Sequence, residues 1–269
     1  MVLTDYPDWT QLAHIVGCDV TVGIEIEAQA IDLDTNITGA EIMVPIDLQG
    51  AYIMMPVDIQ AQYVTIDINI AASAVTLNVA IQSSAVTLNV NLQSSSITLN
   101  VAIQSSAVTL NVNLSSSSIT LNVNISSITG GVTFNIGTVS GTVNVNLQSS
   151  SITLNVQSPA GTTIRCDIVA ETITHLDVHL TTCTLTINVN ITSQSVTINV
   201  NLSSSSITLN VNLQSSSITL NVNIASSAAT INVNLTSQSV NIDINIEAQS
   251  VGVYSQPEWA AKGGTDKDY

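Results

Sequence analysis

Hydrophobic and polar residues alternate along most of this chain, in a pattern that repeats every eleven residues from Val20 to Ser250. The unit that begins at Ile207 reads I-T-L-N-V-N-L-Q-S-S-S. Its first seven residues place four apolar side chains on one face of an extended segment and three polar side chains on the other. The β-branched residues among them favour a strand, and Q-S-S-S supplies a turn. Because eleven is odd, the turn must reset the register so that every strand turns its apolar face the same way.

A fixed short repeat indicates stacked copies of one structural unit. The sequence therefore predicts an all-β fold, an elongated repetitive rod in which one apolar face needs a partner. Three closures fit the spacing: a flattened single-chain β-solenoid with two units per coil, a triangular one with three, and a trimeric β-prism or β-helix in which each chain gives one face. Ala80 and Ala102 alternate with Asn91 and Asn113 at one repeat position, which favours two units per coil. Periodicity alone leaves all three open.

The repeat divides the chain into three parts: a capping or anchoring segment at 1–19, the rod at 20–250, and a capping or docking tail at 251–269. The rod is irregular over 126–184, where glycines interrupt the pattern. Around Cys166 the apolar positions run one residue out of phase, and they return to phase from Leu176. Because slip and recovery cancel, we expect a bulge or bend within one continuous rod.

Both ends carry residues that the repeat lacks. Pro-acid-Trp triplets occur once near each end of the sequence, and we expect these segments to cap the rod or dock it. A short capping helix is predicted from about Pro7, because Leu12, Ile15 and Val16 follow at helical spacing. The predicted anchoring or capping residues are Tyr6, Pro7, Trp9, Pro257 and Trp259.

Composition and charge narrow the functional classes. The chain has 269 residues, is acidic with a formal net charge of −16, and contains three basic residues in all. A nucleic-acid groove or an anionic membrane surface requires clustered Lys and Arg, so we expect neither partner. No segment resembles a membrane-inserted span or a secretory signal peptide. Three cysteines, Cys18, Cys166 and Cys183, are too few and too scattered for a disulfide framework.

One group of residues has the chemistry of a metal site. His175, Asp177 and His179 occupy alternate positions of a predicted strand and so share its polar face. Such strands converging on an axis, or Cys183 approaching, would form a transition-metal site; the alternative is a solvated polar face. No resident cofactor is predicted otherwise. The histidines lack the context of an activated hydroxyl, so we expect no catalytic residues and no enzymatic activity.

Three features resemble virion structural proteins, and more narrowly the repetitive tail-fibre or minor structural proteins of tailed bacterial and archaeal viruses. They are the stretch from Asp5 to Thr10, the I-x-A-Q variants such as Ile26–Gln29, and the ending from Ser255 to Ala261. The resemblance implies a homotrimeric fibre that docks on other virion tail proteins at one end. It also implies assembly in the cytoplasm, a location on the virion and then outside the cell, and host-surface glycans as candidate partners.

These observations favour a non-enzymatic structural fibre of a virion, a tail fibre or minor tail protein that projects toward a host surface. Residues 1–19 are the expected anchor. One alternative is a subunit of a self-assembling extracellular filament that polymerises end to end. Another is an ice-binding β-solenoid, because the Thr after each repeat's first residue would stack into a regular column.

Overall fold

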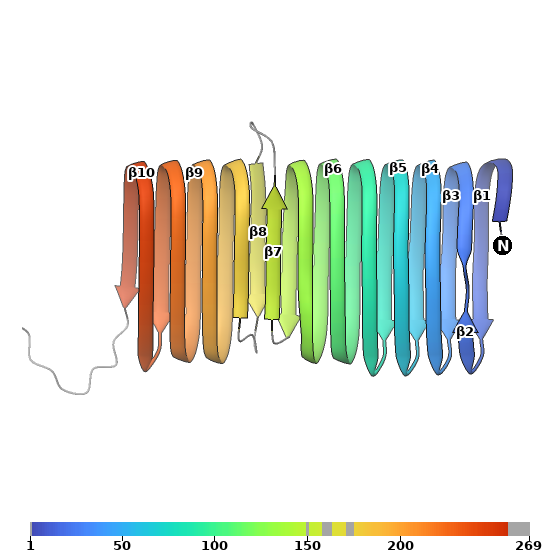
Figure 1. Cartoon of the computed structure of the whole chain (residues 1–269), viewed down its shortest axis with the longest axis horizontal. Helices are drawn as coiled ribbons and strands as arrows, with labels where there is room; N and C mark the ends of the chain where they lie inside the picture. Colours follow the sequence, from blue (N-terminus) through green and yellow to red (C-terminus); the bar gives the residue numbers. More distant parts are fainter. Residues whose placement is uncertain (1, 149–150, 158–162, 171–174, 258–269) are drawn as a thin grey trace, which may run out of the picture.

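The chain winds into a flattened parallel β-solenoid (Figure 1), in a computed structural model that describes residues 2–148, 151–157, 163–170 and 175–257. Several strands continue around corners and so span more than one straight segment. The strands are β1 (Val2–Val16), β2 (Asp19–Thr21), β3 (Ile24–Thr38), β4 (Glu41–Gln60), β5 (Tyr63–Gln82), β6 (Ala85–Gln148), β7 (Ser151–Gln157), β8 (Thr163–Ala170), β9 (His175–Thr236) and β10 (Ser239–Pro257). They form one sheet in the order β1-β3-β4-β5-β6-β7-β9-β10, with β2 on β4 and β8 between β6 and β9.

Each coil of the solenoid contains two repeat units. Val64 pairs with Val86 and Val75 with Ile97, so equivalent residues of neighbouring coils are 22 residues apart, as in the hydrogen-bonded pair Asn78 and Asn100. We call the straight segment that holds Val64 the first arm and the one that holds Val75 the second arm. The two-unit closure, which the Ala and Asn alternation favoured, is the one that the chain adopts. The trimeric prism and the three-unit coil are not adopted.

The core fills the space between the two arms. On β5, Val64, Ile66 and Ile68 of the first arm are buried, and so are Val75 and Leu77 of the second. The same alternation of buried and exposed residues recurs along the rod, and the buried residues form one continuous cluster. Each arm packs its apolar face against the apolar face of the other arm. A single chain therefore buries the apolar faces for which the sequence left the partner open.

Serine side chains close many corners between the arms. Ser94 Oγ donates to the Ser96 carbonyl at 2.9 Å, and Ser215 Oγ donates to the Ser217 carbonyl at 2.9 Å. A hydroxyl that binds the backbone two residues on stabilises a turn locally. The repeated serines of the Q-S-S-S segment are therefore corner residues, as predicted.

The irregular middle keeps the rod continuous. Gly131 of β6 pairs with Ser151 of β7, which pairs with His175 of β9, in steps of 20 and 24 residues. On the second arm, Gly141 pairs with Ile164 of β8. Ile164 then pairs with Leu185, so that steps of 23 and 21 residues replace two steps of 22. The slip around Cys166 and its recovery thus cancel, as the sequence predicted.

The predicted capping helix is wrong. Residues 2–16 form β1, which pairs in parallel with β3, for example Leu12 with Asp34. A helix would have left the backbone donors and acceptors of β3 unpaired, whereas a strand satisfies them. At the other end β10 extends the solenoid to Pro257, which lies opposite Leu235, so the predicted tail begins inside the last coil.

Candidate functional site

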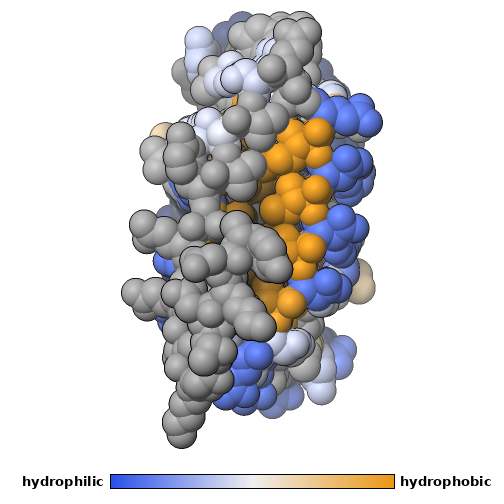
Figure 2. All heavy atoms as spheres, turned by 90° about the vertical axis from the view of Figure 1, so that its left-hand side faces the viewer, coloured by the Kyte–Doolittle hydropathy of each residue, from blue (hydrophilic) through white to orange (hydrophobic). Residues whose placement is uncertain are grey.

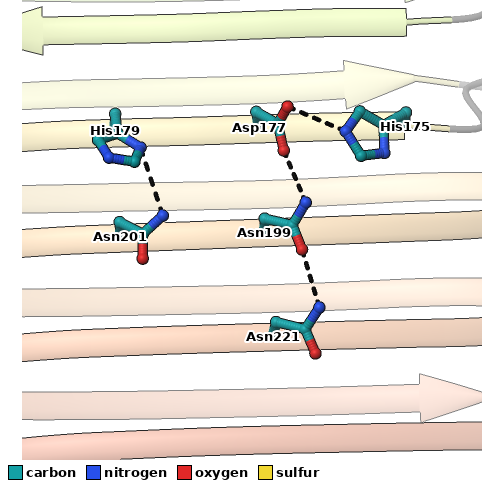
Figure 3. A network of polar contacts seen from close by, with 6 residues as sticks. All are labelled: His175, Asp177, His179, Asn199, Asn201 and Asn221. Atoms are coloured by element: carbon teal, nitrogen blue, oxygen red, sulfur yellow. Dashed lines mark hydrogen bonds and ion pairs between the residues drawn. The ribbon is translucent and has the colours of Figure 1, made fainter.

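The predicted metal-binding residues lie on the first arm of β9 (Figure 3). His175 Nε2 lies 2.9 Å from Asp177 Oδ2, and both side chains are partly exposed, at 42% and 37%. The other carboxylate oxygen of Asp177 accepts a hydrogen bond from Asn199 Nδ2 at 2.7 Å. Both Asp177 oxygens therefore already have partners within the protein.

His179 points to a different neighbour. Its Nδ1 lies 3.3 Å from Asn201 Nδ2 of the next coil, a contact in which the amide donates if the ring nitrogen is unprotonated (Figure 3). Within the described part of the chain, no group of three His, Cys, Asp or Glu side chains is placed to hold a metal ion. The side chains of Cys166 and Cys183 lie outside the described residues, whereas Cys18 is an exposed free thiol.

The geometry of the coil explains why three strands do not converge here. Each coil has two arms whose polar faces point away from each other, so the arms cannot share one polar centre. On a single arm, the nearest neighbours of His175, Asp177 and His179 are the residues one coil away. In the next coil toward the C-terminus, Asn199 stacks on Asp177 and Asn201 stacks on His179. Each asparagine contacts the residue below it as the next member of a stacked polar column.

Stacked asparagines form the dominant polar structure of both arms. On the second arm, Asn100 donates to Asn78 at 2.7 Å, Asn122 to Asn100 at 2.8 Å and Asn144 to Asn122 at 2.7 Å. Each Nδ2 donates toward the N-terminal end of the rod and each Oδ1 accepts from the opposite side. These asparagine ladders join neighbouring coils in addition to the backbone pairing.

Aspartates are acceptors at two levels of one such column on the first arm. Asn89 donates to Asp67 at 2.6 Å, and Asn199 donates to Asp177. A carboxylate only accepts hydrogen bonds when ionised, so it suits a position that receives the amide of the following coil. The Asp177 cluster is therefore explained as part of a ladder, with His175 as a second donor when protonated or in the Nε2–H tautomer.

A shallow groove follows the second arm along the rod, between two outward-facing columns. One column includes Asn78 and Asn100, the other includes Ala80 and Ala102, and inward-facing Val79 lies between them. The alanines make one wall low and apolar. Similar grooves lined by asparagines and valines continue toward the C-terminal end on both arms. Such a strip offers regular amide groups along the rod.

The predicted anchoring residues are only partly described. Tyr6, Pro7 and Trp9 lie within β1, whose backbone is described but whose side chains at these positions are not. Pro257 is the last residue of β10, and Trp259 lies outside the described residues. Their anchoring role stays a prediction.

Four exposed apolar residues near the N-terminal end were missed by the sequence reasoning. They replace the Thr or Ser of the ordinary unit, so a position-by-position alignment of the repeats would have found them. These are Met43, Tyr52, Met54 and Tyr63, each more than half exposed. They share the N-terminal third of the chain with most of its acidic residues. This end of the rod therefore differs in surface chemistry from the Thr- and Asn-covered remainder.

Comparisons with known proteins identify no relative: no protein-family model, no curated protein and no solved structure matches this chain. Among the described residues, no helix has the length and apolar character needed to cross a membrane. The fold and its surfaces therefore carry the functional argument.

Proposed function

We propose that this protein is a non-enzymatic structural fibre of a virion, a rod that projects from the particle toward a host surface. The observation that carries the proposal is the constant pairing register. Steps of 22 residues, with a register shift at the start of β1 and compensated exceptions in the middle, keep every described coil in one sheet around one core. At about 4.8 Å per coil, this gives a rod of roughly 50 Å. A closely packed core and continuous backbone pairing make such a rod stiff, which suits a spacer.

The N-terminal end and the shaft of the rod suit different roles. Exposed Met43 and Tyr63 lie near the N-terminal end, on a part of the surface that is also rich in carboxylates. Exposed large apolar side chains mark contact surfaces more often than a uniform Thr and Asn surface does. We therefore assign docking on other virion proteins to the N-terminal end, and the spacer role to the Thr- and Asn-covered shaft. The virion itself is inferred from the resemblance of the terminal sequences to tail-fibre proteins.

One chain closes its own core, so the fibre does not need three chains to bury its apolar faces. A trimer would have to form by contact between the outer faces of complete rods. The homotrimer stays a prediction, and absolute mass tests it directly.

Immunogold electron microscopy tests the proposed function. Antibodies raised against the purified rod are applied to particles released from lysed cultures of the source cells. Gold on projections of the particles, at a fixed distance from their surface, is the expected result; antibody pre-absorbed with the rod is the control. Gold confined to long filaments outside the cells, with particles unlabelled, would refute the virion assignment and favour the extracellular filament.

A further inference from the structure

Two apolar patches lie on opposite faces of the coil that β4 forms. The two repeat units of β4 read I-M-V-P-I-D-L-Q from Ile42 and I-M-M-P-V-D-I-Q from Ile53. Burial alternates along both units, so each arm turns Met, Pro, Asp and Gln outward in the same order. The polar faces of the arms point away from each other, so the same surface occurs twice on the rod. We call these surfaces the first-arm patch (Met43, Pro45 and Asp47) and the second-arm patch (Met54, Pro56 and Asp58).

The exposure of these methionines differs in origin from that of the apolar row at the C-terminal end of the rod, which Figure 2 shows end-on. At that end, Val240 and Ile242 follow buried residues of the preceding coil and so occupy core positions. Met43 and Met54 occupy outward positions inside the sheet, with a paired coil on each side. They are 52% and 53% exposed. Their exposure therefore reflects the choice of residue and not the end of the sheet.

Each patch contains a proline in the interior of the sheet. Proline has no backbone N–H, so it cannot complete the hydrogen-bond ladder with one of its neighbours. On the first arm, pairing with the preceding coil stops at Met43 and resumes at Ile46. On the second arm it stops at Met54 and resumes at Val57. The same interruption on both arms weakens the sheet, so the outward surface and not the fold accounts for the two prolines.

An exposed tyrosine adjoins each patch. Tyr52 precedes Met54 on the same face of the second arm and is 66% exposed. Tyr63 lies in the following coil, diagonally beside Met43, and is 55% exposed. Methionine and tyrosine are enriched at protein interfaces, where methionine adapts its shape to a partner. Both arms thus offer the same kind of apolar contact surface.

Exposed carboxylates also adjoin both patches. Next to the first-arm patch lie Glu25, Glu41 and Asp67, on the same strand or on the coils that pair with it. Next to the second-arm patch lie Asp32 and Asp34 of the preceding coil. The sequence has no Lys or Arg before position 165, so no lysine or arginine of this end neutralises these groups. A partner with cationic side chains is therefore complementary to both patches.

We propose that the coil formed by β4 binds two copies of one basic partner protein, one copy on each arm. The partner packs apolar side chains on the Met, Pro and Tyr side chains of a patch and places Lys or Arg beside the carboxylates. A surface that fits one arm fits the other, because the two arms present the same side chains in the same order. This inference deepens the docking role proposed for the N-terminal end and rests on it for the place of the partner in the particle.

An NMR titration of the full chain with a synthetic peptide tests the chemistry of the patches. The extended peptide K-S-L-S-L-S-K places its lysines and leucines on one face, which complements apolar residues next to carboxylates. We expect saturable shifts of the amides of 41–47 and 52–58, with two peptides bound per chain. The control peptide K-S-S-S-S-S-K has the same charge and should bind at least about fivefold more weakly, because it buries no leucine.

Two double variants separate the arms. Met43→Thr with Pro45→Asn gives the first arm the ordinary Thr and Asn of the repeat, and it should leave only the shifts of the second arm. Met54→Thr with Pro56→Asn should leave only those of the first arm. Circular dichroism checks that both variants keep the fold. Equal binding of the two peptides, or first-arm shifts that persist in the first variant, would overturn the proposal.

Photo-crosslinking in the source cells tests the two-copy partner. Benzoylphenylalanine replaces Thr65 or Thr76, the threonines that pair with the two methionines. The matched controls carry it at Thr109 or Thr120, the same repeat positions two coils further along the rod. We expect one basic protein to attach at both patch positions and at neither control position. Different proteins at the two patch positions, equal attachment at the controls, or no attachment would overturn the proposal.

The crosslink and the immunogold labelling fail independently. Labelled particles without the crosslink would reject the two-copy partner and leave the virion role. The crosslink together with unlabelled particles would reject the virion role and leave the two-copy partner.

Discussion

Thr35 is a polar residue buried in the core near the N-terminal end. Its side chain is fully buried, and its hydroxyl oxygen lacks a hydrogen-bond partner. In β4 the residue stacked on it is Val57, which is 2% exposed and nearly isosteric with threonine. A buried hydroxyl without a partner costs about 1–3 kcal/mol relative to an apolar group of the same shape.

We therefore expect Thr35→Val to raise the free energy of unfolding by about 1 kcal/mol or more, measured by thermal or denaturant unfolding. The reciprocal control Val57→Thr places the same hydroxyl one coil away and should destabilise by a similar amount. A Thr35→Val protein that is less stable than the parent would show that the hydroxyl has a partner after all.

Leu209 tests the inside and outside assignment of the repeat. Its side chain is fully buried, so Leu209→Asp places an unpaired charge in the core and should cost at least about 4 kcal/mol. Gln214→Asp, at an exposed position of the next corner, is the control and should change stability by less than about 0.5 kcal/mol. Equal melting temperatures for the two variants would contradict the register.

The alternation of single residues was the part of the fold that the sequence predicted best. A period of two assigns each side chain to a face, and the buried set of each arm follows that assignment. Thr35 follows the same rule, because it alternates with buried Leu33 and Ile37 and so faces the core although it is polar. Met43 and Tyr52 show the converse, since apolar residues here occupy outward positions.

At the scale of the element, the asparagine ladders join coils that the backbone already pairs. Asn100 both donates to Asn78 and accepts from Asn122. Asn100→Ala should therefore lower the free energy of unfolding by about 1–2 kcal/mol, because two neighbouring amides each lose a partner.

Asn91→Ala is the matched control for this ladder variant. Asn91 is exposed on the first arm, and its replacement should cost less than about 0.5 kcal/mol. Unfolding in urea compares the two variants. Equal losses would mean that the ladder bonds exchange freely with water and add nothing to the stability of the sheet.

Strands and corners were predictable because their signals are local, whereas the pairing partner was not. Coils of two units, coils of three units and a trimer all bury the same residues, so the hydrophobic pattern is identical in each. The weak alternation of Ala80 and Asn91 was a local trace of the two arms. The capping helix failed for a related reason: the spacing of Leu12 and Ile15 suits a helix, but pairing with β3 decides the conformation.

The candidate metal site also depends on the arrangement of neighbouring coils, and it stays a prediction. His175, Asp177 and His179 do share one polar face, as the alternation predicts. Whether they share a ligand depends on the residues stacked above and below them. In the following coil these residues are asparagines, whose side-chain amides contact Asp177 and His179. The sequence shows the residues of one strand, whereas a column is made by residues 22 positions apart.

At the scale of the whole molecule, a single chain should behave as a short stiff rod. Small-angle X-ray scattering of the full chain, with absolute mass measured on the same sample, should give one chain of 28.1 kDa and an axial length of roughly 50 Å. A meandering strand arrangement would instead extend to roughly 100 Å, at one strand per eleven residues. A mass of three chains with that longer dimension would contradict the solenoid.

The central claim is that each coil consists of two arms, so that residue i stacks on residue i+22. Engineered disulfides test this stacking most directly, because neighbouring parallel strands bring Cα atoms to about 4.8 Å, within the range that a disulfide spans. Three double-cysteine variants are oxidised at low concentration, with the native cysteines replaced by alanine. They share Thr76→Cys and combine it with Thr87→Cys, Thr98→Cys or Thr109→Cys.

Thr76 pairs with Thr98 in the structure, so the Thr76→Cys, Thr98→Cys variant should form an intramolecular disulfide and the other two should not. Thr87 lies on the opposite arm of the coil. A bridge in the Thr87→Cys variant alone would indicate parallel strands stacked eleven residues apart, at one strand per coil. A bridge in the Thr109→Cys variant alone would indicate three units per coil, and either result would contradict the two-armed solenoid.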